Sequence, residues 1–332
     1  MIARCFRSLL LSVLATAPLV AQGRTLTVYS SRSHYGAESV FDEFTRQTGI
    51  KVEFFSGNNN EVLERLRAEG SRSPADVFLA VDAGNLWHAA QLGLLQPVRS
   101  AVLERNIPAH LRDPEGQWFA IAVRARTIVY STERVRPTDL GTYAGLADPK
   151  WRGRLCLRSS SAVYNQSLVA SFIAGRGEPA TEQMLRGWMA NAPTILASDT
   201  PVLQAIAAGQ CDVGITNHYY LARLKQQQPD LPVAAFWADQ GTGGTHVNIS
   251  GAGVTRHTRH RAEAVRFLEF LSTPDAQTRL AAGSFEFPAN PAATAPALAA
   301  AMGQFAPQTI GVAAAGVHQA AAVRLMDRVG YR

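Results

Sequence analysis

The sequence has few cysteines and few long apolar stretches. It contains three cysteines in 332 residues, and one of them, Cys5, lies close to the first residue. Beyond the first twenty or so positions no segment stays apolar over the roughly 20 residues that a membrane-spanning helix needs. The sequence therefore argues against a chain built of several transmembrane helices and predicts a globular protein with a large core.

Common hydrolase motifs are also missing. The sequence contains neither a Gly-x-Ser-x-Gly elbow nor a His-Glu-x-x-His segment. A hydrolase needs a nucleophile together with a base and a group that orients the base. We therefore do not expect an enzyme. An exported hydrolase is the alternative from another class, and it would show turnover where a binding protein shows only saturable binding.

The charge balance is mildly basic and scattered. The formal net charge is +6, and removal of an N-terminal leader with its two arginines would leave +4. The one dense basic run covers residues 256–261. Basic blocks this short usually form a solvated surface turn, so we expect no nucleic-acid partner.

The first 23 residues have the pattern of an export signal. Two arginines precede an apolar run over residues 9–17, Pro18 interrupts this run, and small residues follow at Ala21 and Gly23. A positive start, a short apolar region and a small-residue cleavage site are typical of a secretory signal peptide. We expect residues 1–23 to be removed and the mature protein to reside in the periplasm.

Two cysteines would remain after cleavage, Cys156 and Cys211. An oxidising compartment favours a disulfide between them. Cys156 precedes a run of three serines, and Cys211 precedes the tyrosine pair Tyr219-Tyr220. We therefore expect a disulfide that ties together two loops of a candidate site.

Strand-like and helix-like patterns alternate along the chain. Short apolar or alternating segments near residues 26–29, 50–54, 77–81 and 212–215 predict strands, and stripes at helical spacing lie between them. Such alternation predicts an α/β fold with parallel strands. Two longer extended segments, 121–130 and 241–254, are candidates for strands that cross between two lobes and leave a cleft.

Tyrosines follow two of these strands. His34 and Tyr35 come after the first strand, and Tyr219 and Tyr220 come after the strand at 212–215. Ligands in α/β folds bind beyond the carboxyl ends of the strands. Deprotonated phenols are hard oxygen donors, and hard donors suit hard cations. The pattern points to Fe(III) as the ligand.

Several segments resemble the periplasmic ferric-iron-binding proteins of ABC-type importers. They are LTVYSS at 26–31, HY at 34–35, SPADVF at 73–78, LADPKWRGR at 146–154, RSSSAVYNQ at 158–166, NHYY at 217–220 and VRLMD at 323–327. This resemblance covers nearly all of the chain after the leader, and the double tyrosine is its most diagnostic part.

The resemblance implies a two-lobed periplasmic-binding-protein fold of type II. In this fold two mixed-sheet lobes are joined by crossing hinge strands. We expect residues 24–125 with 251–295 to form the N-terminal lobe. Residues 126–250 with 296–332 would form the C-terminal lobe.

The resemblance also implies a set of iron ligands. Tyr219 and Tyr220 match the family's paired tyrosine ligands, Tyr164 and Tyr35 match two further tyrosines of one subgroup, and His34 matches the histidine beside the first of these. The two lobes would then meet on the metal, with Tyr35 from the first and the other tyrosines from the second.

Another branch of the family binds a carbonate or phosphate beside the metal. Its anion loop and a nearby asparagine align with Ser160, Ser161, Ala162 and Asn217. Arg124 or Arg126 would offset the excess negative charge of several phenolates around a trivalent ion. Asp82 occupies the position of an acidic ligand in a further branch, and we leave it outside the metal's ligand set.

The sequence thus predicts a monomeric periplasmic receptor that takes ferric ion or a ferric chelate and delivers iron to an inner-membrane ABC permease. The alternative within the same fold is a receptor for another small solute, such as an organic anion, thiamine or a polyamine, because fold does not fix function.

Overall fold

The computed structural model describes residues 24–32 and 39–332. The expected leader, residues 1–23, and the segment with His34 and Tyr35 lie outside the described residues. The strands are β1 (Thr25–Ser30), β2 (Lys51–Ser56), β3 (Val77–Val81), β4 (Phe119–Ser131), β5 (Leu155–Arg158), β6 (Thr194–Leu196), β7 (Val213–Asn217), β8 (Val233–Phe236) and β9 (Val247–Val254).

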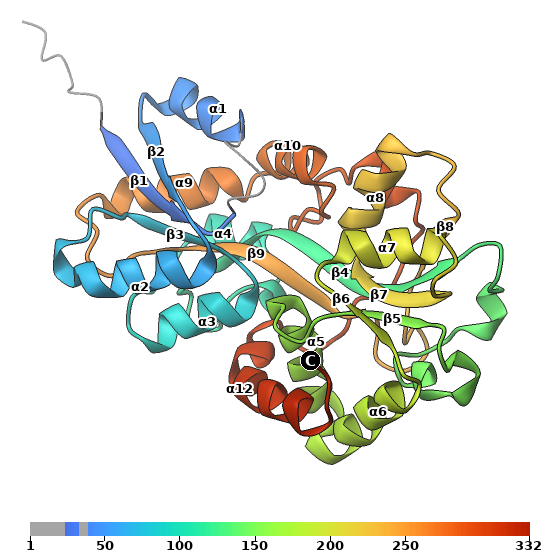
Figure 1. Cartoon of the computed structure of the whole chain (residues 1–332). Helices are drawn as coiled ribbons and strands as arrows, with labels where there is room; N and C mark the ends of the chain where they lie inside the picture. The colour runs from blue at the N-terminus through green and yellow to red at the C-terminus, as the bar shows by residue number, and fades with distance from the viewer. Residues whose placement is uncertain (1–23, 33–38) are drawn as a thin grey trace, which may run out of the picture.

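The α-helices pack around these strands (Figure 1). They are α1 (Ser39–Thr48), α2 (Asn59–Glu69), α3 (Ala83–Gln91), α4 (Ala101–Asn106), α5 (Val163–Arg176), α6 (Glu178–Ala190), α7 (Asp199–Ala207), α8 (His218–Gln227), α9 (Arg261–Leu271), α10 (Pro274–Ser284), α11 (Ala297–Ala300) and α12 (Ala313–Arg328). Short 3₁₀ turns occupy several of the connections.

The first lobe is built on a mixed sheet. Its strands run in the order β2-β1-β3-β9-β4, with β1 parallel to β2 and β3, and β9 antiparallel to β3 and β4. Strand β3 is buried along its whole length, which agrees with its continuous apolar sequence. Helices α1, α9 and α10 pack on one apolar cluster of this lobe through Phe44, Phe267 and Leu280.

The second lobe carries the other mixed sheet. Strand β7 pairs antiparallel with β4 and parallel with β5, β5 pairs with β6, and β8 pairs with β4. Helices α5 and α6 cover one face with Phe172, Leu185 and Trp188. Helices α7 and α8 contribute Leu203, Ile206 and Leu221 to a separate apolar cluster.

Strand β4 belongs to both sheets. Its residues up to Ala125 pair with β9, whereas those from Arg126 onward pair with β7 and β8. All thirteen residues of β4 are buried. The extended run near 121–130 is therefore a strand that crosses between the lobes, as the sequence predicts, and the two-lobed mixed α/β fold is confirmed.

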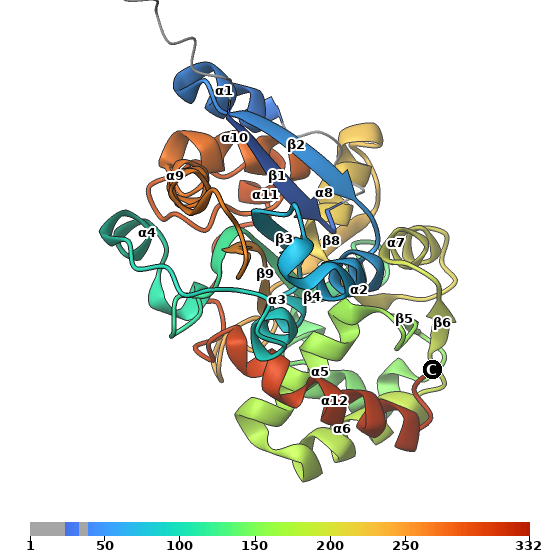
Figure 2. The same ribbon diagram turned by 90° about the vertical axis from the view of Figure 1, so that its left-hand side faces the viewer.

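The C-terminal helix α12 lies beside α5 and also touches α3 of the first lobe (Figures 1 and 2). Gly316 allows this approach, because a Cβ there would come within 2.5 Å of the Trp87 side chain on α3. Ala322, Leu325 and Met326 on the same helix join the core of the second lobe. Helix α12 thus contacts both lobes.

The expected disulfide is present. Cys156 on β5 and Cys211, just before β7, are bonded with their Cα atoms 5.9 Å apart. The bond joins the segments that lead into the serine run and into the tyrosine pair. Within residues 24–32 and 39–332, no helix combines the length and apolar character needed to cross a bilayer.

Candidate metal centre

The tyrosine pair lies where a strand becomes a helix. Strand β7 ends at Asn217, and α8 begins at His218. The rings of Tyr219 and Tyr220 are 4.5 Å apart between centroids, tilted by 31°. Neighbouring residues within a regular strand or helix point in different directions, so this junction lets two consecutive phenols lie side by side.

Tyr164 comes to the same place from a distant part of the sequence. It is the second residue of α5 and is 7% exposed. Burial, the largest effect, raises the pKa of its phenol, and Tyr220 raises it further. The nearby Arg124 charge and a side-chain hydrogen bond with Tyr219 lower the pKa, but the net result is a raised pKa. The structure therefore brings together three of the four predicted tyrosines, and Tyr35 lies outside the described residues.

Two arginines flank the ring of Tyr164. The guanidinium carbon of Arg124 lies 5.0 Å from the ring centroid, and that of Arg158 lies 5.2 Å from it. Cations over an aromatic face are attracted by the ring quadrupole. They also favour the anionic form of a phenol. Both charges would therefore stabilise a phenolate at Tyr164.

Arg124 is itself held between two buried carboxylates. Its Nη2 lies 3.7 Å from Asp82 Oδ2, its Nη1 lies 3.7 Å from Glu286 Oε1, and Nη1 donates to Ser250 Oγ at 3.2 Å. The two carboxylates lie within ion-pair distance but beyond hydrogen-bond distance. The guanidinium charge is therefore shared between these carboxylates and the adjacent Tyr164 phenol.

Asp82 links the lobes beside the site. Its carboxylate accepts hydrogen bonds from Ser167 Oγ on α5 at 2.6 Å and from Asn248 Nδ2 on β9 at 2.9 Å. It also caps α3 by accepting from the Gly84 N–H. Asp82 thus has hydrogen-bond partners from both lobes.

Arg126 has different surroundings from Arg124. Its Nε donates to Asn165, its Nη1 donates to Asp199 and Asn217, and its Nη2 donates to the Ile215 carbonyl. Every nitrogen of the guanidinium is engaged within the second lobe. The Asn217 amide in turn donates to the Tyr219 hydroxyl at 3.3 Å, so Arg126 positions a tyrosine through Asn217.

The predicted anion loop lies between β5 and α5. Ala162 precedes the first residue of α5 as its N-cap, with no side-chain cap. The hydroxyls of Ser159 and Ser161 are hydrogen-bonded to each other at 3.0 Å, and the Ser160 carbonyl accepts from Gln166. The loop leaves the first backbone N–H groups of α5 without a side-chain partner, which is the arrangement that attracts anions.

A cavity of about 930 Å³ opens beside this loop. Its walls come from both lobes, with Asn58 and Asn85 from the first lobe and Arg158 and Ser161 from the second. The nitrogens Nε and Nη1 of Arg158 are buried and, in the described part of the chain, have no hydrogen-bond partner, although Nη1 lies 3.6 Å from Asp199 Oδ2 in an ion pair. Polar groups therefore line this space, and Arg158 connects it to the ring of Tyr164.

His218 packs between Phe287 and the tyrosine pair, with its ring 5.9 Å from the Tyr219 ring between centroids at an interplanar angle of 84°. Its ring stacks on Phe287 at 4.2 Å between centroids, and its Nδ1 accepts from the Ala125 N–H at 3.1 Å. Burial lowers its pKa to about 4, so the ring is neutral at physiological pH. Its Nδ1 is thus occupied by the backbone of β4.

The described residues offer few conventional metal ligands. Within residues 24–32 and 39–332, no group of three or more His, Cys, Asp or Glu could hold a metal ion. Any metal in this part of the protein would therefore need other donors. The phenol oxygens of Tyr164, Tyr219 and Tyr220 are the candidates that the fold gathers.

Sequence reasoning missed several charged residues around the site. Arg158 appeared only as part of a matched segment, and Arg223, whose guanidinium lies 5.7 Å from the Tyr220 ring centroid, was not singled out. Arg32 and Glu286 form a buried ion pair at 2.9 Å. Burial alone would raise the pKa of Glu286, but Arg32 and Arg124 hold it below its ordinary value. Arg32 and Glu286 are 254 residues apart, so no local pattern indicates their pairing. Arg223 lies three residues after Tyr220 on α8, and this helical spacing is visible in the sequence.

Comparisons with known proteins agree with this architecture. Residues 30–278 match the model of the bacterial extracellular solute-binding protein family. The chain is 43% identical over 321 residues to iron uptake protein A2 of Synechocystis, covering 94% of this chain and 91% of that protein. It is 30% identical over 285 residues to the major ferric iron-binding protein of Neisseria meningitidis, covering 83% of each chain.

A solved structure extends the comparison. The Trichodesmium protein IdiA (FutA), in complex with iron and citrate ligands, superposes with a TM-score of 0.89 at 41% identity, covering 93% of this chain and 100% of that chain. The matched relatives are named as uptake and binding proteins. The chain therefore belongs to the family of bacterial extracellular solute-binding proteins.

Proposed function

We propose that this protein is the periplasmic receptor of a ferric-iron importer. It binds Fe(III) through tyrosine phenolates between its two lobes and delivers the iron to an inner-membrane ABC permease. The observation that carries the proposal is the meeting of Tyr164, from the start of α5, with Tyr219 and Tyr220, from the start of α8. The iron-binding relatives support the same cargo.

The electrostatics around the tyrosines fit a trivalent cation. Three phenolates neutralise Fe(III), and a fourth phenolate leaves one negative charge in excess. Arg124 and Arg158, which flank Tyr164, offset such an excess. A metal ion overrides the ordinary pKa of its ligands, so phenols that are protonated in the free protein ionise when iron binds.

The remaining ligands come from the segment that the structure does not describe. His34 and Tyr35 follow β1 by a few residues, and β1 ends next to β3 in the first lobe. With Tyr35 from the first lobe and three tyrosines from the second, iron joins the two lobes. We assign residues 24–125 with 251–295 to the first lobe and 126–250 with 296–332 to the second. The change in the pairing of β4 at Arg126 supports the boundary at 125/126, whereas residues 247–250, which begin β9, pair with residues 122–125 in the sheet of the first lobe.

The proposal includes a synergistic anion, carbonate or phosphate, beside the metal. Ser160, Ser161 and Ala162 lie in the loop before α5, and Asn217 donates to the Tyr219 hydroxyl; backbone N–H groups at a helix start suit an anion. The protein acts as a monomer, carries no catalytic chemistry and is exported by a leader that is cleaved. Its partners are ferric ion or a ferric chelate and the permease.

A titration tests the proposal. Ferric citrate added to the purified protein without iron should give a visible phenolate-to-iron absorption band that saturates at one iron per protein, with no turnover of the chelator. A polyamine, thiamine or an iron-free organic anion should give no such band. Tight binding of one of those solutes, with no colour from ferric citrate, would assign the receptor to another cargo.

A further inference from the structure

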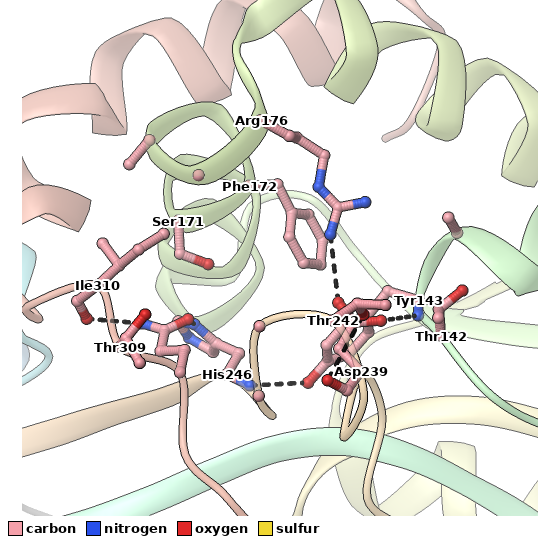
Figure 3. A pocket seen from close by; sticks show the side chains of 16 residues that line it. Thr142, Tyr143, Ser171, Phe172, Arg176, Asp239, Thr242, His246, Thr309 and Ile310 are labelled. Carbon is pink, nitrogen blue, oxygen red and sulfur yellow. Dashed lines mark hydrogen bonds and ion pairs between the residues drawn. The ribbon is translucent and has the colours of Figure 1, made fainter.

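One tyrosine hydroxyl lies between the two chain segments that cross from lobe to lobe. The Tyr143 hydroxyl donates to the Arg126 carbonyl at 2.5 Å and accepts from the His246 N–H at 3.1 Å. Arg126 is the residue at which β4 changes partners, and His246 directly precedes β9. Figure 3 shows the Tyr143 and His246 side of this contact.

The hydroxyl takes the place of one bond of the β-ladder. Strands β4 and β9 are antiparallel, with Ala125 opposite Val247, and the Arg126 N–H donates to the His246 carbonyl at 3.1 Å. In an antiparallel ladder the two residues of a hydrogen-bonded pair exchange both N–H···O bonds. Here the return bond from His246 to Arg126 runs through the Tyr143 hydroxyl, so the ladder opens at this rung with no backbone group left unsatisfied.

Tyr143 is fixed to the second lobe by its other atoms. Its ring packs on Phe172 at 5.0 Å between centroids, its carbonyl accepts from Trp188 Nε1 at 2.9 Å, and its N–H donates to Asp239 Oδ1 at 3.1 Å. The side chain is 1% exposed. The hydroxyl is therefore held rigidly at the end of a well-packed ring.

A cavity of about 620 Å³ lies against this contact, on the surface formed by the end of α5 and the segments around residues 239–246 and 308–310 (Figure 3). His246 faces it with its ring hydrogen-bonded to Gln308 Oε1 at 3.1 Å. Arg176 donates to Asp239 Oδ2 at 3.2 Å. The space gives the crossing segments room to change their angle.

We propose that Tyr143 is a positioning residue at the hinge of the receptor. Its hydroxyl couples the two crossing segments, so that the lobes close as rigid units and retain iron. This inference rests on the proposed function, because iron release is its readout. The Phe variant leaves the His246 N–H and the Arg126 carbonyl, both buried, without their shared partner. These two groups must then either bond directly to each other, which changes the angle between the lobes, or remain without their hydrogen bonds.

The test compares the rate of iron release to excess chelator in Tyr143→Phe and in the unchanged protein. The loss of the visible band over time measures this rate. We expect the band and the stoichiometry to stay the same while release becomes roughly tenfold faster, the factor that corresponds to one lost net hydrogen bond. The matched control is Tyr29→Phe. It removes a phenol hydroxyl that donates to Glu69 at 2.9 Å within the first lobe alone, and it should release iron at the unchanged rate.

Hydrogen exchange provides a second readout that does not need iron. In Tyr143→Phe the His246 amide should exchange at least about tenfold faster, while amides of β7 and β3 keep their protection. Equal release rates and equal His246 exchange in Tyr143→Phe and the unchanged protein would overturn the proposed role of Tyr143 at the hinge. A protein with no iron band in any form would instead overturn the proposed function, so the two failures are distinguishable.

Discussion

Buried tyrosines serve this protein in two different ways. Tyr143 and Tyr331 each donate to a backbone carbonyl and accept from a second group; Tyr331 donates to the Arg158 carbonyl at 2.8 Å and accepts from Asn165 at 2.8 Å. Tyr164 and the pair Tyr219-Tyr220 instead lie next to one another and next to guanidinium groups.

The difference lies in the partners. Burial raises the pKa of Tyr143 and Tyr331, and both hydroxyls are committed to neutral hydrogen bonds. A phenol in that position resists ionisation, because the anion would lose its donor role and remain desolvated. Tyr164 is also buried, at 7% exposed against 1% for Tyr143 and 2% for Tyr331, and its pKa is also raised, but Arg124 and Arg158 lie over its ring. Arginine charges also act on Tyr331, so the backbone hydrogen bonds of the hydroxyl, more than burial or a nearby charge, separate a structural phenol from a candidate ligand.

The largest expected effect distinguishes the candidate ligand tyrosines from the structural tyrosines. The double variant Tyr219→Phe/Tyr220→Phe should lose more than about a thousandfold in iron affinity and, because iron is then no longer retained, the visible band; the four ligands of structural zinc sites together supply roughly 10–16 kcal/mol, which sets the scale for losing two ligands. Tyr143→Phe should keep the full band. Equal colour in the double variant and the unchanged protein would remove the distinction between the two sets.

Proton release follows from the raised pKa of Tyr164. A phenol whose pKa lies above its ordinary value of about 10 is protonated at neutral pH, so each phenolate formed on iron binding releases one proton. Affinity should therefore rise with pH and fall in acid, by roughly a factor of ten per pH unit for each phenolate. A weakly buffered titration should record about three to four protons per iron. Release of fewer than one proton would contradict phenolate ligation.

The disulfide should matter for stability more than for colour. Cys156→Ser/Cys211→Ser frees a loop of 55 residues, which corresponds to about 4 kcal/mol in the chain-entropy model and commonly to about 2–4 kcal/mol in practice. Urea denaturation of the iron-free protein would measure the loss. The folded variant should still form the band, because α5 and α8 carry their tyrosines independently of the bond. Loss of colour with unchanged folding would show that the bond positions the ligands.

A smaller effect is expected at Arg124. Arg124→Lys keeps the charge but alters the contacts with Tyr164, Asp82 and Glu286, and groups around metal ligands commonly change affinity by about 10- to 100-fold. We expect about a tenfold weaker affinity with the same band. Arg126→Lys is the comparison, since that guanidinium lies within the hydrogen-bond network of the second lobe. A larger loss in Arg126→Lys would assign the main charge compensation to Arg126.

Local sequence patterns predicted the elements that carry the site. The apolar strand before Asn217 and the helix after it account for the side-by-side tyrosines, and the oxidising compartment accounts for the Cys156–Cys211 bond. The crossing strand is also visible in sequence as a long extended run over residues 121–130, although Arg124 and Arg126 interrupt its apolar character. In each case the cause lies within one segment or in general chemistry.

Contacts between distant segments could not be predicted in this way. Arg32 and Glu286 are 254 residues apart and meet in a buried ion pair. The Tyr143 hydroxyl enters the β-ladder from a loop 103 residues before its partner His246. Neither position differs from ordinary surface or core residues until the fold brings its partner close.

The most direct test of the account is the resonance Raman spectrum of the iron-loaded protein, excited within the visible band. Phenolate ring vibrations should be strongly enhanced in the unchanged protein and in Tyr143→Phe, and absent from Tyr219→Phe/Tyr220→Phe. One equivalent of tightly bound iron without any enhanced phenolate vibration would show that the gathered tyrosines are not its ligands.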